Sequence, residues 1–227
     1  MRSPSAVILA AAVVGAFSQN ASASDFGMPW TGWYAGVNVG GGWGRTNHTG
    51  TETPDATNFD LTTTGNFNTS GWVAGATAGY NFQIRQWLIG AETDLDWSNI
   101  RGTFNANPAS GPLSASTQLN WLDTARIRVG WIWSRALFYG TAGAAFGGVT
   151  ASASSLGNAD PTDDFNRADT QVRFGWTAGG GVEYAFTDNL SAKVEYLFVN
   201  LGTQTQIDND SVKFSTNMVR GGVNVRF

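Results

Sequence analysis

The sequence contains no cysteine, a single histidine and few charged residues. Asp, Glu, Lys and Arg together make up 13% of the 227 residues. Without cysteine, disulfides and thiolate metal sites are excluded. The formal net charge is −4, so the chain lacks the excess of basic residues that a nucleic-acid-binding protein needs. The lone His48 offers little material for hydrolytic catalysis. We therefore predict no enzymatic activity, no metal and no cofactor.

Long apolar runs are also scarce, and the only one lies at the N-terminus. Residues 6–17 are apolar, follow a positively charged start and precede the A-x-A sequence Ala21-Ser22-Ala23. This pattern predicts a secretory signal peptide over residues 1–23, cut between Ala23 and Ser24. The run is short of the ~20 residues that a membrane helix needs, and no longer one follows. If the mature domain, residues 24–227, spans a membrane, it does so with strands.

Glycine and aromatic residues are abundant and alternate in a regular way. The chain has 29 Gly and 10 Trp. Between residues 174 and 198, bulky apolar residues alternate with small or charged ones on both sides of a short turn at residues 187–189, which predicts a β-hairpin. Pairing residue 186 with 190 sets Glu183 opposite Lys193, a favourable cross-strand charge pair. A bulky face turned outward and a polar face turned inward is typical of a barrel in lipid.

The same alternation predicts six further strands, at residues 32–44, 71–82, 87–97, 119–131, 135–150 and 214–227. Polar segments at residues 45–70, 99–118, 151–170 and 200–213 are expected to be long loops, and the connections between them are short. Long extracellular loops that alternate with short periplasmic turns are the pattern of bacterial outer-membrane barrels. An even number of strands closes without a free edge. We predict an all-β, eight-stranded antiparallel transmembrane up-and-down barrel in the cell outer membrane, with ten strands as the alternative.

Nine tryptophans fall near the ends of the predicted strands. Indole rings prefer the headgroup level, so two aromatic belts are expected. The periplasmic belt would hold Trp33, Trp87, Trp131 and Trp133, and the extracellular belt Trp43, Trp72, Trp97, Trp121 and Trp176. One residue departs from the pattern: Asp123 falls on the outward row, which suits a membrane protein only if it lies above the lipid.

The inward rows of the predicted strands carry five acids and five bases. They are Glu92, Asp94, Asp96, Glu183, Glu195, Arg126, Arg128, Lys193, Arg220 and Arg226. The interior of an eight-stranded barrel is just wide enough for side chains to fill. Buried charges must be paired, so we predict an ion network that plugs the lumen. A selective pore lined by the same charges is the alternative.

Three segments carry a family resemblance: GWTAGGGVEYAFTDNLSAKVEYLFVNLG at residues 175–202, GWYAGVNVGGGWG at residues 32–44 and the terminal GGVNVRF. They resemble the small outer-membrane β-barrel proteins of alphaproteobacteria, porin-like surface antigens related to the OmpA transmembrane and opacity barrels. The resemblance implies an eight-stranded barrel inserted by the barrel-assembly machinery, which would read the terminal aromatic Phe227. Some relatives are described as hemin-binding.

These observations predict a structural, envelope-stabilising protein that presents polar loops at the cell surface. The expected partners are outer-membrane lipid, lipopolysaccharide and the barrel-assembly machinery, with host surface molecules or phage at the loops. A narrow porin for small solutes and a surface receptor for a small ligand such as hemin are the alternatives. The sequence leaves the oligomeric state open.

Overall fold

Eight antiparallel strands form one closed barrel, as the sequence predicts. The computed structural model describes residues 30–49, 66–106, 113–155, 165–205 and 211–227, so the predicted signal peptide and its cleavage site lie outside the described residues. The strands are β1 Gly32–Thr49, β2 Asn66–Ile84, β3 Trp87–Ala106, β4 Leu113–Trp133, β5 Ala136–Ser155, β6 Phe165–Ala185, β7 Leu190–Thr205 and β8 Ser211–Arg226. Within the described ranges, no helix is long and apolar enough to cross a membrane.

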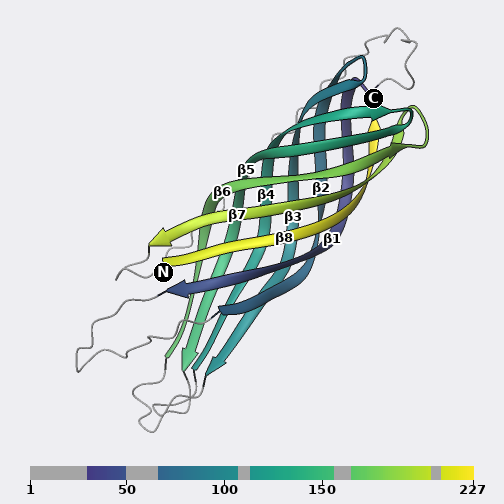
Figure 1. Cartoon of the computed structure of the whole chain (residues 1–227). Coiled ribbons are helices and arrows are strands. Elements are labelled where there is room, and N and C mark those ends of the chain that lie inside the picture. Colours follow the sequence, from purple (N-terminus) through teal and green to yellow (C-terminus); the bar gives the residue numbers. More distant parts are fainter. Residues whose placement is uncertain (1–29, 50–65, 107–112, 156–164, 206–210) are drawn as a thin grey trace, which may run out of the picture.

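Each strand pairs with its neighbours in sequence, and β1 pairs with β8 to close the wall. The strands wind steeply around the barrel (Figure 1). One circuit of the register leads from Tyr34 back to β1 at Gly44, ten residues further on, through Gly79, Glu92, Arg126, Gly143, Thr177, Val199 and Thr216. An offset of this size in an eight-stranded barrel corresponds to a strand tilt of roughly 40°.

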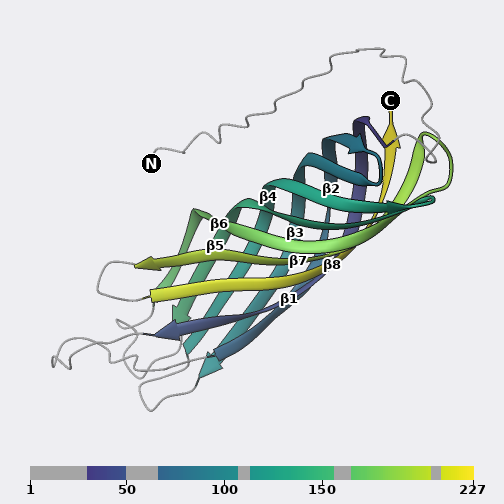
Figure 2. The ribbon, with the colours of Figure 1, turned by 45° about the horizontal axis from the view of Figure 1, so that its top comes forward.

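Three tight turns lie at the same end of the barrel as the C-terminus (Figure 2). Two of them hold a non-glycine residue in the left-handed region, Arg85 with φ 56° and Ser134 with φ 57°. The third follows Phe186, where the Thr187 hydroxyl accepts hydrogen bonds from the backbone N–H groups of two following residues. Glu183 pairs with Lys193 across the β6–β7 hairpin, which confirms the predicted register.

The predicted strand ends are wrong at the opposite end of the barrel. Residues 45–49, 99–106 and 113–118 were expected in long loops but belong to β1, β3 and β4. The other loops are shortened in the same way. Backbone pairing continues here although the hydropathy alternation stops. Where polar Thr, Ser and Asn occupy both faces, a hydrophobic pattern does not mark the strand. His48, expected in a loop, lies in β1 opposite Val212.

Bulges also change which face a residue occupies. The register shifts in β4 between Leu119 and Trp121, so the inward row moves from odd to even positions. Leu119 is therefore fully buried in the lumen, whereas uninterrupted alternation from Trp121 would have placed it outside.

Candidate functional site: the barrel lumen

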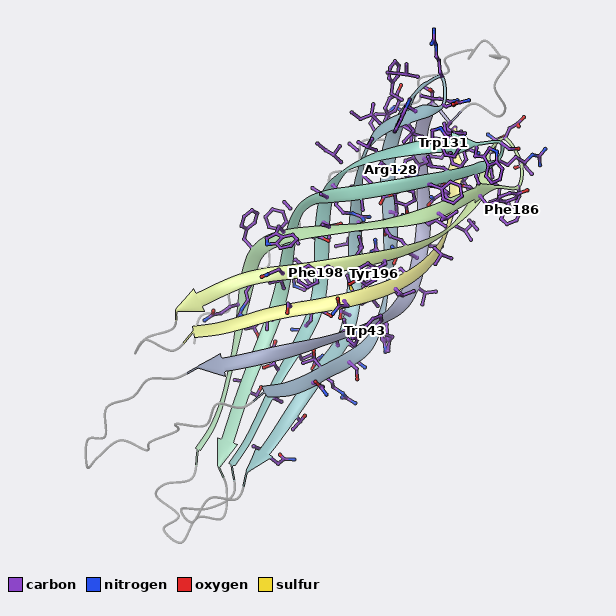
Figure 3. The ribbon with its side chains drawn as sticks, in the orientation of Figure 1. Trp43, Arg128, Trp131, Phe186, Tyr196 and Phe198 are labelled. Atoms are coloured by element: carbon purple, nitrogen blue, oxygen red, sulfur yellow. The ribbon has the colours of Figure 1, made fainter. Side chains whose placement is uncertain are left out.

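All ten charged residues predicted for the lumen are buried, with at most 5% of each residue exposed. They come from five strands, β3, β4, β6, β7 and β8. Arg128, for example, is fully buried inside the wall, whereas Phe186 stands at the end with the tight turns (Figure 3). Charge pairing is required at this depth, because an isolated buried ion costs several kcal/mol.

Glu92 is the centre of the network. Its Oε1 binds Arg126 in a short ion pair. Its Oε2 binds Lys193 Nζ at 2.9 Å and Arg128 at 3.3 Å, and accepts a 2.7 Å hydrogen bond from the Tyr34 hydroxyl. One carboxylate from β3 thus holds residues from β1, β4 and β7.

A second group joins three carboxylates through two arginines. Arg126 bridges Asp94 at 2.6 Å and Glu195 at 2.8 Å. Arg220 binds Glu195 at 2.6 Å, Asp94 at 3.2 Å and also Asp96. Because Arg126 also binds Glu92, these pairs form one continuous ionic layer across the barrel.

The expected Glu183–Lys193 ion pair is not formed, although the two residues are register partners. Glu183 instead binds Arg128 at 2.7 Å, and accepts hydrogen bonds from the Ser191 hydroxyl and the Asn224 amide. Lys193 reaches across the lumen to Glu92. Both side chains are long enough to reach partners on strands other than the one opposite. The register therefore determines that they face the lumen but not which ion pairs they form.

This difference changes which pairs should be energetically coupled. A double-mutant cycle for Glu92→Gln and Lys193→Met should give a coupling of about 1–3 kcal/mol in the free energy of unfolding. The cycle for Glu183→Gln and Lys193→Met should give less, about 0.5 kcal/mol or below. Reversible denaturant unfolding of the refolded barrel measures both. The assignment of ion partners is wrong if the second coupling equals or exceeds the first.

Two tyrosines and one arginine in the lumen carry roles that the sequence interpretation missed. Tyr34 accepts a 3.0 Å hydrogen bond from Arg128, and Tyr139 donates to Glu195 at 3.2 Å. The Arg128 guanidinium lies 4.3 Å from the Tyr139 ring centroid. Arg173 is buried and lies on the inward row of β6 with Glu183. The alternation of inward and outward residues along this strand could therefore have identified it.

Apolar side chains fill the lumen on both sides of the ionic layer. One buried cluster consists of Val73, Ile100, Leu119, Leu122, Ala145, Val149, Leu197, Val199, Leu201 and Met218. The other, at the end with the tight turns, consists of Trp30, Leu88, Ile132, Leu137, Tyr139 and Ala185. We call them the extracellular and the periplasmic apolar layer.

Trp30 belongs to no strand, but its side chain is part of the periplasmic apolar layer. It precedes β1 and has no exposed surface. Its backbone N–H donates to the Gln83 side chain at 2.8 Å, and the Arg226 guanidinium lies 4.3 Å from its ring centroid. This contact links a residue two positions before β1 to the last residue of β8. Trp30, which lies before the first predicted strand, is therefore part of the lumen.

The other nine tryptophans lie on the outer face at two heights. Eight are between 40% and 67% exposed, and Trp121 is half-buried. Following paired residues once around the eight strands leads ten residues higher along β1. Residues at the same height along the barrel axis are therefore shifted from the paired positions by about 1.25 residues for each strand. With this correction, three other tryptophans fall within about two residues of the height of Trp33 and four others within about two residues of the height of Trp43, in the groups predicted. The strands continue beyond the extracellular group of tryptophans, so these residues do not lie at strand ends.

The spacing of the two tryptophan levels matches a membrane. The ten residues from Trp33 to Trp43, at a rise of ~3.3 Å and a tilt of ~40°, span about 25 Å along the barrel axis. This is the usual height of the apolar band on outer-membrane barrels. The same correction places the ionic layer between the two levels and the two apolar layers near them.

The pattern of a closed barrel with an apolar band and two aromatic levels has a counterpart among known families. The family described as "Outer membrane protein beta-barrel domain" matches residues 9–227. The chain belongs to this family. It is an outer-membrane β-barrel protein, as predicted, and its resemblance to alphaproteobacterial surface antigens is also confirmed.

Relatives of this outer-membrane barrel come from alphaproteobacteria. The 31 kDa outer-membrane immunogenic protein of Brucella melitensis is 34% identical over 204 residues, which cover 87% of this chain and 84% of that protein. The 22 kDa outer membrane protein of Rhizobium leguminosarum bv. viciae is 32% identical over 70% of this chain and 68% of that protein. Neither is named as an enzyme.

Solved structures of outer-membrane barrels share the fold, for example that of an outer-membrane protease. The outer membrane protease OmpT of Escherichia coli superposes with a TM-score of 0.54 at 8% identity, covering 86% of this chain and 97% of that one. At this identity the likeness concerns the fold alone. In the described part of this chain, no group of three His, Cys, Asp or Glu side chains could hold a metal ion.

Proposed function

We propose that this outer-membrane barrel is a closed, structural protein that presents its extracellular end at the cell surface. The observation that carries the proposal is the stack of an ionic layer between two apolar layers inside the wall. Residues of all three layers, including Trp30, Arg128, Leu122 and Met218, have less than 2% of their surface exposed. A side chain beside a water-filled passage would expose more.

A second feature supports surface presentation. The strands extend beyond the extracellular tryptophan level, to Ala106 in β3 and from Phe165 in β6, whereas they end close to the periplasmic level. The wall therefore projects from the membrane on one side only. The relatives named outer-membrane immunogenic proteins fit a surface-exposed position. Lipopolysaccharide, host surface molecules and phage are the partners that we propose for this end.

Assembly in the membrane is assigned to the C-terminus. Phe227 is 74% exposed on the outer face, and its backbone N–H donates to the Trp33 carbonyl at 3.1 Å, which anchors it beside the β1–β8 seam. An exposed terminal aromatic at the closing seam suits recognition by the barrel-assembly machinery. We retain that role for Phe227 as part of the proposal.

Conductance separates the closed barrel from the narrow porin. Refolded protein in planar bilayers should give no steady unit conductance, because three dry layers interrupt the path of ions. The folded fraction, measured by heat-modifiable migration on a gel, must be high in the same preparation, so that silence is not a failure to insert. Steady unit conductance whose ion selectivity changes in Lys193→Met would establish the porin instead.

A further inference from the structure

Asp123 is a charged residue on the lipid-facing band. Among the described residues between the two tryptophan levels, it is the only Asp, Glu, Lys or Arg on the outward rows. It lies on β4 two residues below Trp121, at the lower edge of the extracellular level. Interfacial depth lowers the cost of a carboxylate, which makes the position tolerable in lipid.

Among the residues that the structure describes, none donates a hydrogen bond to the Asp123 carboxyl group. Its register partners are Leu95 on β3 and Phe146 on β5, both large and apolar. Its Oδ1 is buried and has no hydrogen-bond partner. A carboxylate in this setting favours a cation that can approach from the membrane side.

A strip of small residues lies on the outer face below Asp123, toward the middle of the membrane, and the exposed side chain of Ile127 on β4 borders it. The strip consists of Ala125, Gly140, Ala142, Ala144, Ala178 and Gly180, which are register neighbours across β4, β5 and β6. A β-carbon added at Gly140 would make one ordinary van der Waals contact, with the Gly179 carbonyl oxygen at 3.9 Å, and no closer one. Phe146 and Trp176 stand above this strip, and Phe138 and Val182 below it.

We propose that Asp123 and the strip beneath it bind one membrane lipid with an ammonium headgroup. The ammonium pairs with the Asp123 carboxylate at the extracellular level, and an acyl chain lies along the strip toward the middle of the membrane. The order of the two features along the barrel axis, charge at the interface and an apolar strip of small residues below, matches the order of headgroup and chain in a lipid. A second barrel copy would need a cation opposite Asp123, and the described outward rows between the tryptophan levels offer none.

Native mass spectrometry of the refolded protein tests this with phosphatidylethanolamine and phosphatidylglycerol of identical chains. Wild type should retain one phosphatidylethanolamine in preference to phosphatidylglycerol. Asp123→Asn should lower that preference by about fivefold, the effect of one partly exposed ion pair. Ala142→Leu should weaken retention of both lipids, because its side chain occupies the strip.

Asp188→Asn is the matched control, since Asp188 is exposed in a periplasmic turn and should leave lipid retention unchanged. Heat-modifiable migration confirms that each variant is folded. The proposal fails if wild type and Asp123→Asn retain the two lipids equally. It also fails if Asp123→Asn instead dissolves a dimer of barrels, which would make this face a protein interface.

Discussion

Glu92→Gln is expected to lower the free energy of unfolding by about 3–5 kcal/mol. Glu92 is the shared partner of Arg126, Arg128 and Lys193, and all three cations are buried with it. Glutamine keeps the shape but removes the charge, so the three cations lose a common counter-ion at a depth where water does not replace it. Denaturant unfolding of the refolded barrel, followed by tryptophan fluorescence, measures the loss.

Two comparisons make the Glu92 result specific. Asp188→Asn removes one acidic charge from an exposed turn and should change stability by no more than about 0.5 kcal/mol. Lys193→Met should cost less than Glu92→Gln, because Glu92 keeps its two arginines. A Glu92→Gln variant within about 1 kcal/mol of wild type would mean that water reaches the network, and would contradict the closed lumen.

Trp30→Ala should also be strongly destabilising, by about 3–5 kcal/mol. The indole is fully buried in the periplasmic apolar layer and packs against Arg226, so its removal leaves a cavity and an arginine without its aromatic partner. Because the contact joins the segment before β1 to the end of β8, the barrel should also unfold faster. Equilibrium and kinetic unfolding measurements test the two effects.

Trp33→Ala is the matched control for Trp30→Ala. It removes the same side chain three residues away, from a position on the outer face that is 48% exposed. The loss there should be clearly smaller, since lipid or detergent fills the space that the indole leaves. Equal losses at the two positions would show that Trp30 does not close the lumen.

Much of the architecture follows from the sequence because a strand repeats every two residues. Alternation assigns Glu92, Arg128 and Lys193 to the lumen and nine of the ten tryptophans to the outer face without any knowledge of their neighbours. The length of the Thr187–Asn189 turn fixes the register of Glu183 and Lys193. The two tryptophan groups follow from where the residues fall along each strand. These are local properties, and a linear sequence displays them.

The contacts inside the lumen were decided only by the closed barrel. Lys193 binds Glu92 and Glu183 binds Arg128 because closure brings β3, β4, β6 and β7 around a space that long side chains can cross. Trp30 enters the lumen although it belongs to no strand. Leu119 faces the lumen because of a bulge in β4. The strands also extend into polar segments beyond the extracellular tryptophan level. Periodicity assigns a residue to a face, whereas the distance between distant strands selects its partner.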